Sequence, residues 1–247
     1  MTSLSNNEIK RIKSLQQKKF RDELGLFVVE GEKMVEEACR SSYDIEKICL
    51  RDDIGEEAMK RISSLASPSP VLAVVRKPSD AYVDDPSSLD EVLADGGLFL
   101  ALDTIRDPGN LGTILRIADW FGIKAVFAAP DTVDLFNPKV VQSTMGAIFR
   151  LPFAYVDSLD QVMDRCKELG ITTYAAHLGG KNNYDKEDYH GGSAFLIGNE
   201  GNGLPETVSS RCSRRITIPM YGNIESLNAA MAAGILMWEM AKGRKGK

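Results

Sequence analysis

Three polar or glycine-rich segments, each placed directly after a predicted strand, hold most of the residues in this chain that could do chemistry. They are DTIRDPGNLGTILR at 103–116, GNEGNGLP at 198–205 and IPMYGNIESLN at 218–228. Ligands of open α/β sheets bind outside the carboxyl ends of the strands. We therefore expect the three segments to lie together and to form one site.

The first segment combines a tight turn with an unusual arginine. Pro108 and Gly109 predict the turn, and Asn110 is expected to cap the helix that follows. Arg116 then falls inside an otherwise apolar run of that helix, where a guanidinium needs a partner or a cleft. A surface arginine with a buried stem is the alternative that the spacing leaves open.

The second segment has three glycines within six residues, which allows a ligand to approach the backbone closely. It matches neither the dinucleotide fingerprint nor the P-loop, and Glu200 within it would repel phosphates. The composition thus favours a cationic or neutral ligand over a nucleotide phosphate. A purely structural turn is the alternative.

The third segment leads from a strand into a helix that is expected to begin near Ser226. Ser226 and Asn228 would then lie at the helix N-terminus, where such side chains cap free N–H groups. The small residues after them would let another backbone pack closely. Capping and tight packing alone would also explain this segment.

The hydrophobic pattern from residue 97 onward alternates strands with helices, which is typical of a mostly parallel sheet covered on both faces. Residues 1–76 predict a smaller α/β unit that opens with a capping box at Ser5 and Glu8, and 77–96 is interpreted as a linker. In the larger part, strands are expected at 98–102, 124–128, 149–156, 172–176, 194–197 and 215–218, and helices at 111–121, 138–145, 159–169, 205–212 and 226–242.

Composition narrows the class of protein. The four cysteines are scattered and there are two histidines, which argues against a metal site and against Ser-His-Asp chemistry. No apolar run is long enough for a bilayer and the N-terminus is polar, so a cytoplasmic location is expected. The net charge of −5 counts against nucleic-acid binding, but basic residues gather between Lys10 and Arg21. Taken alone, these residues are explained more simply by a solvated helix face.

Taken together, the stretches DPGNLGTILRIADWFG, FLIGNEGNGLP and IPMYGNIESLNAAMAAGI resemble the three motifs of the SpoU branch of the SPOUT methyltransferases. The stretch IKSLQQKKFRDELGLFVVEGEKMVEEA resembles that family's RNA substrate-binding domain. The resemblance implies an α/β fold with a SPOUT-type parallel sheet and a C-terminal trefoil knot, preceded by a small N-terminal α/β RNA-binding domain. It assigns residues 1–76 to RNA binding, 77–96 to a linker and 97–247 to the methyltransferase, with a homodimer through the C-terminal domain.

The resemblance also implies an activity, the transfer of a methyl group from S-adenosylmethionine to a ribose 2′-hydroxyl of rRNA or tRNA, with large-subunit rRNA favoured. Its catalytic positions correspond here to Asn110, Arg116, Glu200, Ser226 and Asn228. Its cofactor-binding positions correspond to Ile197, Gly198, Ile218, Met220 and Leu227. The chain departs from the pattern at Ala229 and Ala230, where relatives often carry valine and serine.

Arginine keeps its proton in proteins, so we expect Arg116 to hold a neighbouring phosphate and to stabilise the developing alkoxide rather than to act as the base. The phosphate, or a water molecule, would then take the hydroxyl proton. Two other classes of protein are alternatives: a relative that binds RNA but has lost activity, and a nicotinamide dehydrogenase, which the missing dinucleotide fingerprint disfavours.

Overall fold

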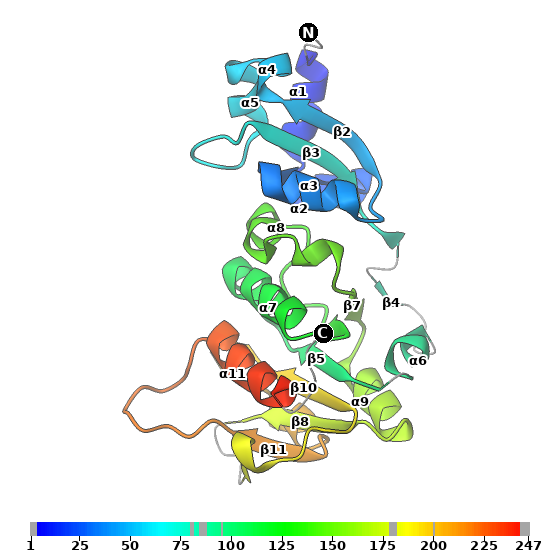
Figure 1. Cartoon of the computed structure of the whole chain (residues 1–247), viewed down its shortest axis with the longest axis vertical. Helices are drawn as coiled ribbons and strands as arrows, with labels where there is room; N and C mark the ends of the chain where they lie inside the picture. Colours follow the sequence, from blue (N-terminus) through cyan, green and yellow to red (C-terminus); the bar gives the residue numbers. More distant parts are fainter. Residues whose placement is uncertain are drawn as a thin grey trace. The chain divides into compact units, whose positions relative to one another are not determined.

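The computed structural model describes residues 4–79, 82–83, 88–94, 96–177, 182–199 and 201–242. The chain divides into two compact units (Figure 1). The first comprises the residues up to Ser79 together with Asp134–Arg150, and the second comprises Asp80–Val133 and Leu151–Lys247. The predicted domain limits at residues 76 and 97 remain a prediction. In the structure, residues 134–150 pack with the first unit.

The first unit is built on a three-stranded antiparallel sheet in the order β1-β3-β2. The predicted capping box is confirmed, because Ser5 Oγ accepts from the Glu8 N–H at 3.2 Å and Glu8 Oε2 accepts from the Ser5 N–H at 2.9 Å. The elements of this unit are α1 (Asn6–Ser14), α2 (Lys18–Leu24), β1 (Leu26–Glu30), α3 (Glu32–Arg40), β2 (Ile45–Leu50), α4 (Arg51–Ile54), α5 (Glu56–Ile62), β3 (Val71–Arg76), α8 (Pro138–Thr144) and η2 (Ala147–Phe149).

The second unit is built on a sheet in the order β4-β7-β6-β5-β10-β8-β11-β9, in which every pairing within the described residues is parallel. The predicted parallel sheet is therefore confirmed. Its strands are β4 (Tyr82–Val83), β5 (Leu98–Leu102), β6 (Ala125–Ala128), β7 (Phe153–Val156), β8 (Thr172–Ala176), β9 (Asn182–Asn183), β10 (Ser193–Ile197) and β11 (Arg214–Thr217). Its helices are α6 (Ser88–Leu93), α7 (Pro108–Trp120), α9 (Leu159–Glu168), η3 (Tyr184–Lys186), α10 (Glu206–Ser209) and α11 (Ala229–Ala241).

At the centre of this sheet, β5 and β10, the strands that lead into the first and second segments, lie side by side. β5 and β10 are buried along their whole length, and Leu102 pairs with Ile197. Continuous apolar runs of this kind are expected for strands that are covered on both faces. The first and second segments therefore leave the sheet at neighbouring positions.

Two boundary predictions were wrong. Asn110 does not cap α7; Asp107 does, because Pro108 takes the first helical position and Asp107 Oδ1 accepts from the Asn110 N–H at 2.8 Å. The last helix begins at Ala229 and not near Ser226, because Asn228 Oδ1 caps the N–H groups of Ala230 and Met231. Within the residues interpreted as a linker lie α6 and β4, and β4 pairs with β7.

Two further elements are shorter than predicted. β7 begins at Phe153, because residues 147–149 form a 3₁₀ turn instead of the start of the strand. The helix expected at 205–212 covers only Glu206–Ser209. Neither difference moves the residues of the three segments.

Candidate functional site

A cavity of about 620 Å³ lies where the strands β8, β10 and β11 end, within the second unit. The second and third segments form most of its wall, and α11 closes one side. All five predicted cofactor-binding residues line it. The lining residues include Ile197, Gly198, Asn199, Gly201, Asn202, Gly203, Leu204, Ile216, Thr217, Ile218, Pro219, Met220, Tyr221, Ser226 and Leu227.

The second segment folds into a closed loop that requires a glycine at position 198. Asn199 Oδ1 accepts from the N–H groups of Gly201 at 2.9 Å and Asn202 at 2.7 Å. A Cβ on Gly198 would lie 2.0 Å from the carbonyl carbon of Gly203, a distance that no side chain tolerates. The loop therefore places bare backbone against the cavity, as a closely bound ligand needs.

The third segment gives the cavity an apolar and open side. Met220 is 62% exposed, Leu227 46% and Ile224 69%, although all three are large apolar side chains that line the cavity. Clustered exposure of this kind marks ligand or partner surfaces more often than solvent-facing chain.

The first and third segments are joined directly at the starts of two helices. Asn228 Nδ2 donates to Asn110 Oδ1 at 2.9 Å. Farther along, a Cβ on Gly234 would lie 3.4 Å from Ile117, and the rings of Phe121 and Trp238 are 6.0 Å apart. These three pairs share nearly the same sequence offset, so α7 and α11 run parallel with their N-termini together.

The predicted catalytic residues fall into three groups. Asn110 and Asn228 are bonded to each other, and Ser226 lies in the cavity wall. Arg116 lies on the exposed side of α7 and forms no ion pair with any residue that the structure describes. Glu200 is outside the described residues. The structure therefore shows the second interpretation of Arg116, an arginine at the protein surface. Its charge is accessible to a binding partner.

Ala176 and His177 line the cavity but lie far in sequence from the three segments, and no motif predicted them. Ala176 and His177 follow the end of β8, and the His177 N–H donates to the Ile216 carbonyl at 2.9 Å. The signal that would have found them is their place at the carboxyl end of a parallel strand. The histidine was passed over because no motif surrounds it.

The buried thiols do not suit nucleophilic chemistry. Burial raises the pKa of Cys166 to about 12 and that of Cys212 to about 11, so both are protonated at neutral pH. Among the described residues no three His, Cys, Asp or Glu side chains are grouped to hold a metal. No described helix is long and apolar enough to cross a membrane.

The fold and the cavity define an α/β protein with a cavity of small-molecule size, lined largely by apolar groups, at the carboxyl ends of parallel strands. Residues 97–238 match the SpoU rRNA Methylase family, and residues 6–77 match the MRM3-like substrate binding domain. The chain therefore belongs to the SpoU family, as the three motifs predicted.

Relatives that are named as RNA methyltransferases match nearly the whole chain. The 23S rRNA (guanosine(2553)-2′-O)-methyltransferase RlmP of Bacillus subtilis is 30% identical over 96% of this chain and 97% of its own length. The AdoMet-bound rRNA methyltransferase of Sinorhizobium meliloti has a TM-score of 0.89 at 30% identity, covering 100% of this chain and 98% of that one. AviRb of Streptomyces viridochromogenes, in complex with AdoMet, has a TM-score of 0.84 at 25% identity, covering 97% and 98%.

Proposed function

We propose that this chain is an S-adenosylmethionine-dependent methyltransferase that modifies a ribose 2′-hydroxyl of large-subunit rRNA. The observation that carries the proposal is the cavity, in which the five predicted cofactor residues meet around the bare backbone of Gly198. The similarity to RlmP and to the rRNA methyltransferase of Sinorhizobium meliloti supports the same substrate class. The cytoplasm is the expected location.

The cavity suits S-adenosylmethionine in size and in chemistry. Its volume of about 620 Å³ is in the range of small-molecule sites. Ile197, Ile218 and Leu227 offer apolar contacts, and the closed loop at Gly198 offers backbone groups. When bound, this cofactor supplies a methyl group that its sulfonium has already activated for transfer.

The residues of the chain would then align the acceptor and manage charge. The N-termini of α7 and α11 lie together, and paired helix N-termini favour an anion such as the RNA phosphate next to the target ribose. The exposed Arg116 guanidinium would hold that phosphate in a bidentate manner and stabilise the alkoxide. The proton would pass to the phosphate or to water.

Asn110 and Asn228 are joined by a hydrogen bond, and we expect the two residues to act together in catalysis. We expect Asn110→Ala and Asn228→Ala each to lower the rate of methyl transfer, and the double variant to be no slower than the slower single one. The reason is that either change removes the same 2.9 Å bond. Single-turnover rates for the four proteins test this; multiplying effects would contradict a shared role.

The trefoil knot expected for this family is proposed for this chain as well. The strand β11 lies beyond β8 in the sheet, yet α11 after it returns to pack against α7 and β10. The third segment therefore passes back across the ends of the strands that hold the second segment, which is the path a knot requires.

We expect a homodimer through the pair α7 and α11. Trp120 is 83% exposed, Met231 60% and Trp238 55%, and these helices pack on each other. Light scattering should give about twice the chain mass of 27.1 kDa. Trp120→Glu should give a folded monomer, because the mutated side chain is mostly solvent-exposed within one chain. A monomeric wild type would contradict the proposal.

Two alternatives remain as outcomes of one test. Purified protein and labelled S-adenosylmethionine are incubated in three separate reactions, one each with unmodified large-subunit rRNA, small-subunit rRNA and bulk tRNA. Label in large-subunit rRNA is the expected result. Label only in tRNA would show that the substrate is a tRNA. RNA binding without any methyl transfer would indicate a relative that has lost activity.

A further inference from the structure

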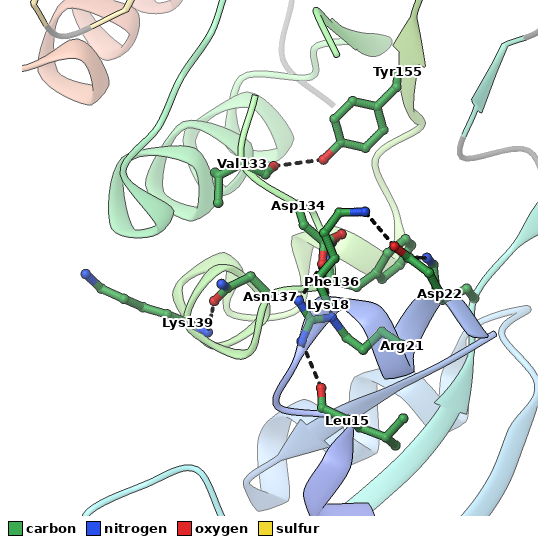
Figure 2. A network of polar contacts seen from close by, with 11 residues as sticks. Leu15, Lys18, Arg21, Asp22, Val133, Asp134, Phe136, Asn137, Lys139 and Tyr155 are labelled. Atoms are coloured by element: carbon green, nitrogen blue, oxygen red, sulfur yellow. Dashed lines mark hydrogen bonds and ion pairs between the residues drawn. The ribbon is translucent and has the colours of Figure 1, made fainter. Parts of the chain in front are cut away.

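The first unit uses part of the basic run at residues 10–21 for its own internal contacts. Arg21 Nη2 and Nε donate to Asp134 Oδ2 at 2.6 and 3.0 Å (Figure 2). The two side chains are only 2% and 6% exposed, so this ion pair lies in the core of the unit. Lys18 Nζ is held by Asp22 Oδ2 at 2.6 Å (Figure 2). The charges of Arg21 and Lys18 are therefore balanced within the unit.

The side of α1 that faces β2 is balanced in the same way. Glu8 and Arg11 are three residues apart and therefore neighbours on the helix surface. Arg11 Nη1 donates to Glu46 Oε1 at 2.5 Å, and Glu8 Oε1 accepts from Lys47 Nζ. Both charges that α1 presents on this side thus have an opposite partner on β2.

The other side of α1 carries cations that are not balanced. Asn6, Lys10 and Lys13 form one stripe, because residues three or four apart are neighbours on a helix. Asn6 Oδ1 accepts from Arg61 Nη1 at 3.3 Å, so the stripe lies beside the end of α5. Lys10, Lys13 and Arg61 are exposed, and none of them forms an ion pair with a residue that the structure describes. We call the surface formed by these three cations the α1–α5 face.

The acids of α4 and α5 are not paired with the α1–α5 face. Lys60 Nζ lies 3.6 Å from Glu56 Oε1 and 3.8 Å from Glu57 Oε1, so these two carboxylates share one base. Asp52 and Asp53 belong to α4, which packs on α5 and on β2. The three cations of the face therefore keep their charge toward solvent.

The opposite face of the sheet differs in charge. α1 and α5 cover the face that carries Leu26 and Val28, whereas α3 lies on the other (Figure 1). The charged side chains of α3 are three acids and two bases: Glu32, Glu36, Glu37, Lys33 and Arg40. Unbalanced positive charge thus gathers on the side of the unit where α1 and α5 lie.

We propose that the α1–α5 face is the surface through which the first unit binds the phosphate backbone of RNA. The inference rests on the proposed function, which requires an RNA substrate. Three cations without acidic partners fit a polyanion, because each can neutralise a phosphate and release its counterions. Contacts to phosphates hold RNA without reading its sequence. The face therefore supplies affinity and does not select the nucleotide.

The triple variant Lys10→Gln, Lys13→Gln, Arg61→Gln tests this surface. Filter binding measures its affinity for a large-subunit rRNA transcript over a series of salt concentrations, without S-adenosylmethionine. Each lost phosphate contact should lower the slope of log affinity against log salt by about 0.7 to 0.9, so we expect roughly a hundredfold weaker binding near 0.1 M salt. Thermal unfolding and affinity for S-adenosylmethionine should stay at wild-type values, because the three side chains are exposed and lie in the first unit.

The matched control is the triple variant Arg11→Gln, Lys33→Gln, Arg40→Gln. It removes the same total charge from the same unit, but from the side of α1 that faces β2 and from α3. Its affinity for the transcript should stay within about threefold of wild type, since its arginines are ion-paired and exposed pairs contribute little. Equal losses for the two triple variants would overturn the proposal, because total charge alone would then determine binding.

A second measurement uses the wild-type chain. Acetic anhydride modifies exposed lysines, and peptide mass spectrometry gives the rate at each position with and without the transcript. Bound RNA should slow acetylation of Lys10 and Lys13 several-fold and leave Lys33 unchanged. Unchanged rates at Lys10 and Lys13, or a wild type that binds no RNA, would overturn the proposal. A wild type that binds RNA but transfers no methyl group would count against the proposed function alone, because neither measurement needs methyl transfer.

Discussion

Arg116→Ala should lose methyl transfer by about a thousandfold in kcat, with affinity for S-adenosylmethionine changed by no more than a few-fold. The physical reason is the position of this guanidinium. It is exposed on α7, forms no ion pair with any described residue and is absent from the wall of the cofactor cavity. Its charge is therefore available to the RNA phosphate and to the alkoxide that develops during transfer.

Arg116→Lys separates geometry from charge. A lysine retains the charge but loses the planar fork that binds a phosphate through two parallel hydrogen bonds, so we expect no rescue. Thr113→Ala, at an exposed position on the same helix, is the matched control and should behave as wild type. Near-normal turnover of either arginine variant would show that the role assigned to Arg116 is wrong.

Gly198→Ala should abolish measurable cofactor binding, a loss of about a hundredfold or more in affinity. The added Cβ would lie 2.0 Å from the Gly203 carbonyl carbon and 2.2 Å from the Leu204 nitrogen, so the loop must open. Titration calorimetry with S-adenosylmethionine measures the loss, and circular dichroism checks that the sheet is retained.

A glycine outside the cavity provides a control for this change. Gly191 is absent from the cavity wall, and a Cβ on it would meet nothing within 4 Å. Gly191→Ala should therefore bind the cofactor with nearly wild-type affinity. Equal affinities for the two variants would mean that the shape of the loop at Gly198 does not determine binding.

The strands of the large sheet were predictable because their signal is local. The run Leu98–Leu102 is apolar without interruption, and β5 is buried along its length. The strand-end rule then brought the second and third segments together, and their predicted cofactor residues share one cavity. The family resemblance supplied which of those residues to choose.

Two kinds of feature could not be predicted from the sequence: the choice between competing capping residues, and contacts between residues that are distant in the chain. Asp107 and Asn110 are both good capping residues, and the choice between them depended on the place of Pro108. The two-residue strand β4 is too short to show a period. The aromatic residues Phe136 and Phe149 indicate that residues 134–150 are partly buried. The local sequence does not predict that their rings pack against Phe27 and Tyr43, more than a hundred residues earlier in the chain.

The central claim is that the methyl group is attached to a ribose 2′-oxygen and not to a base. Among the described residues of the cavity and the three segments, Tyr221 is the one Phe, Tyr or Trp side chain, and it is 97% exposed, whereas enzymes that modify a flipped base usually stack it between aromatic or apolar walls. Alkaline cleavage of RNA uses the 2′-oxygen as its nucleophile, so a methyl group there blocks cleavage at that linkage.

The decisive measurement is therefore alkaline hydrolysis of large-subunit rRNA that has been treated with this protein and labelled S-adenosylmethionine. The account predicts that the label is recovered in an alkali-resistant dinucleotide. Label recovered only in mononucleotides would contradict it and would assign the methyl group to a base.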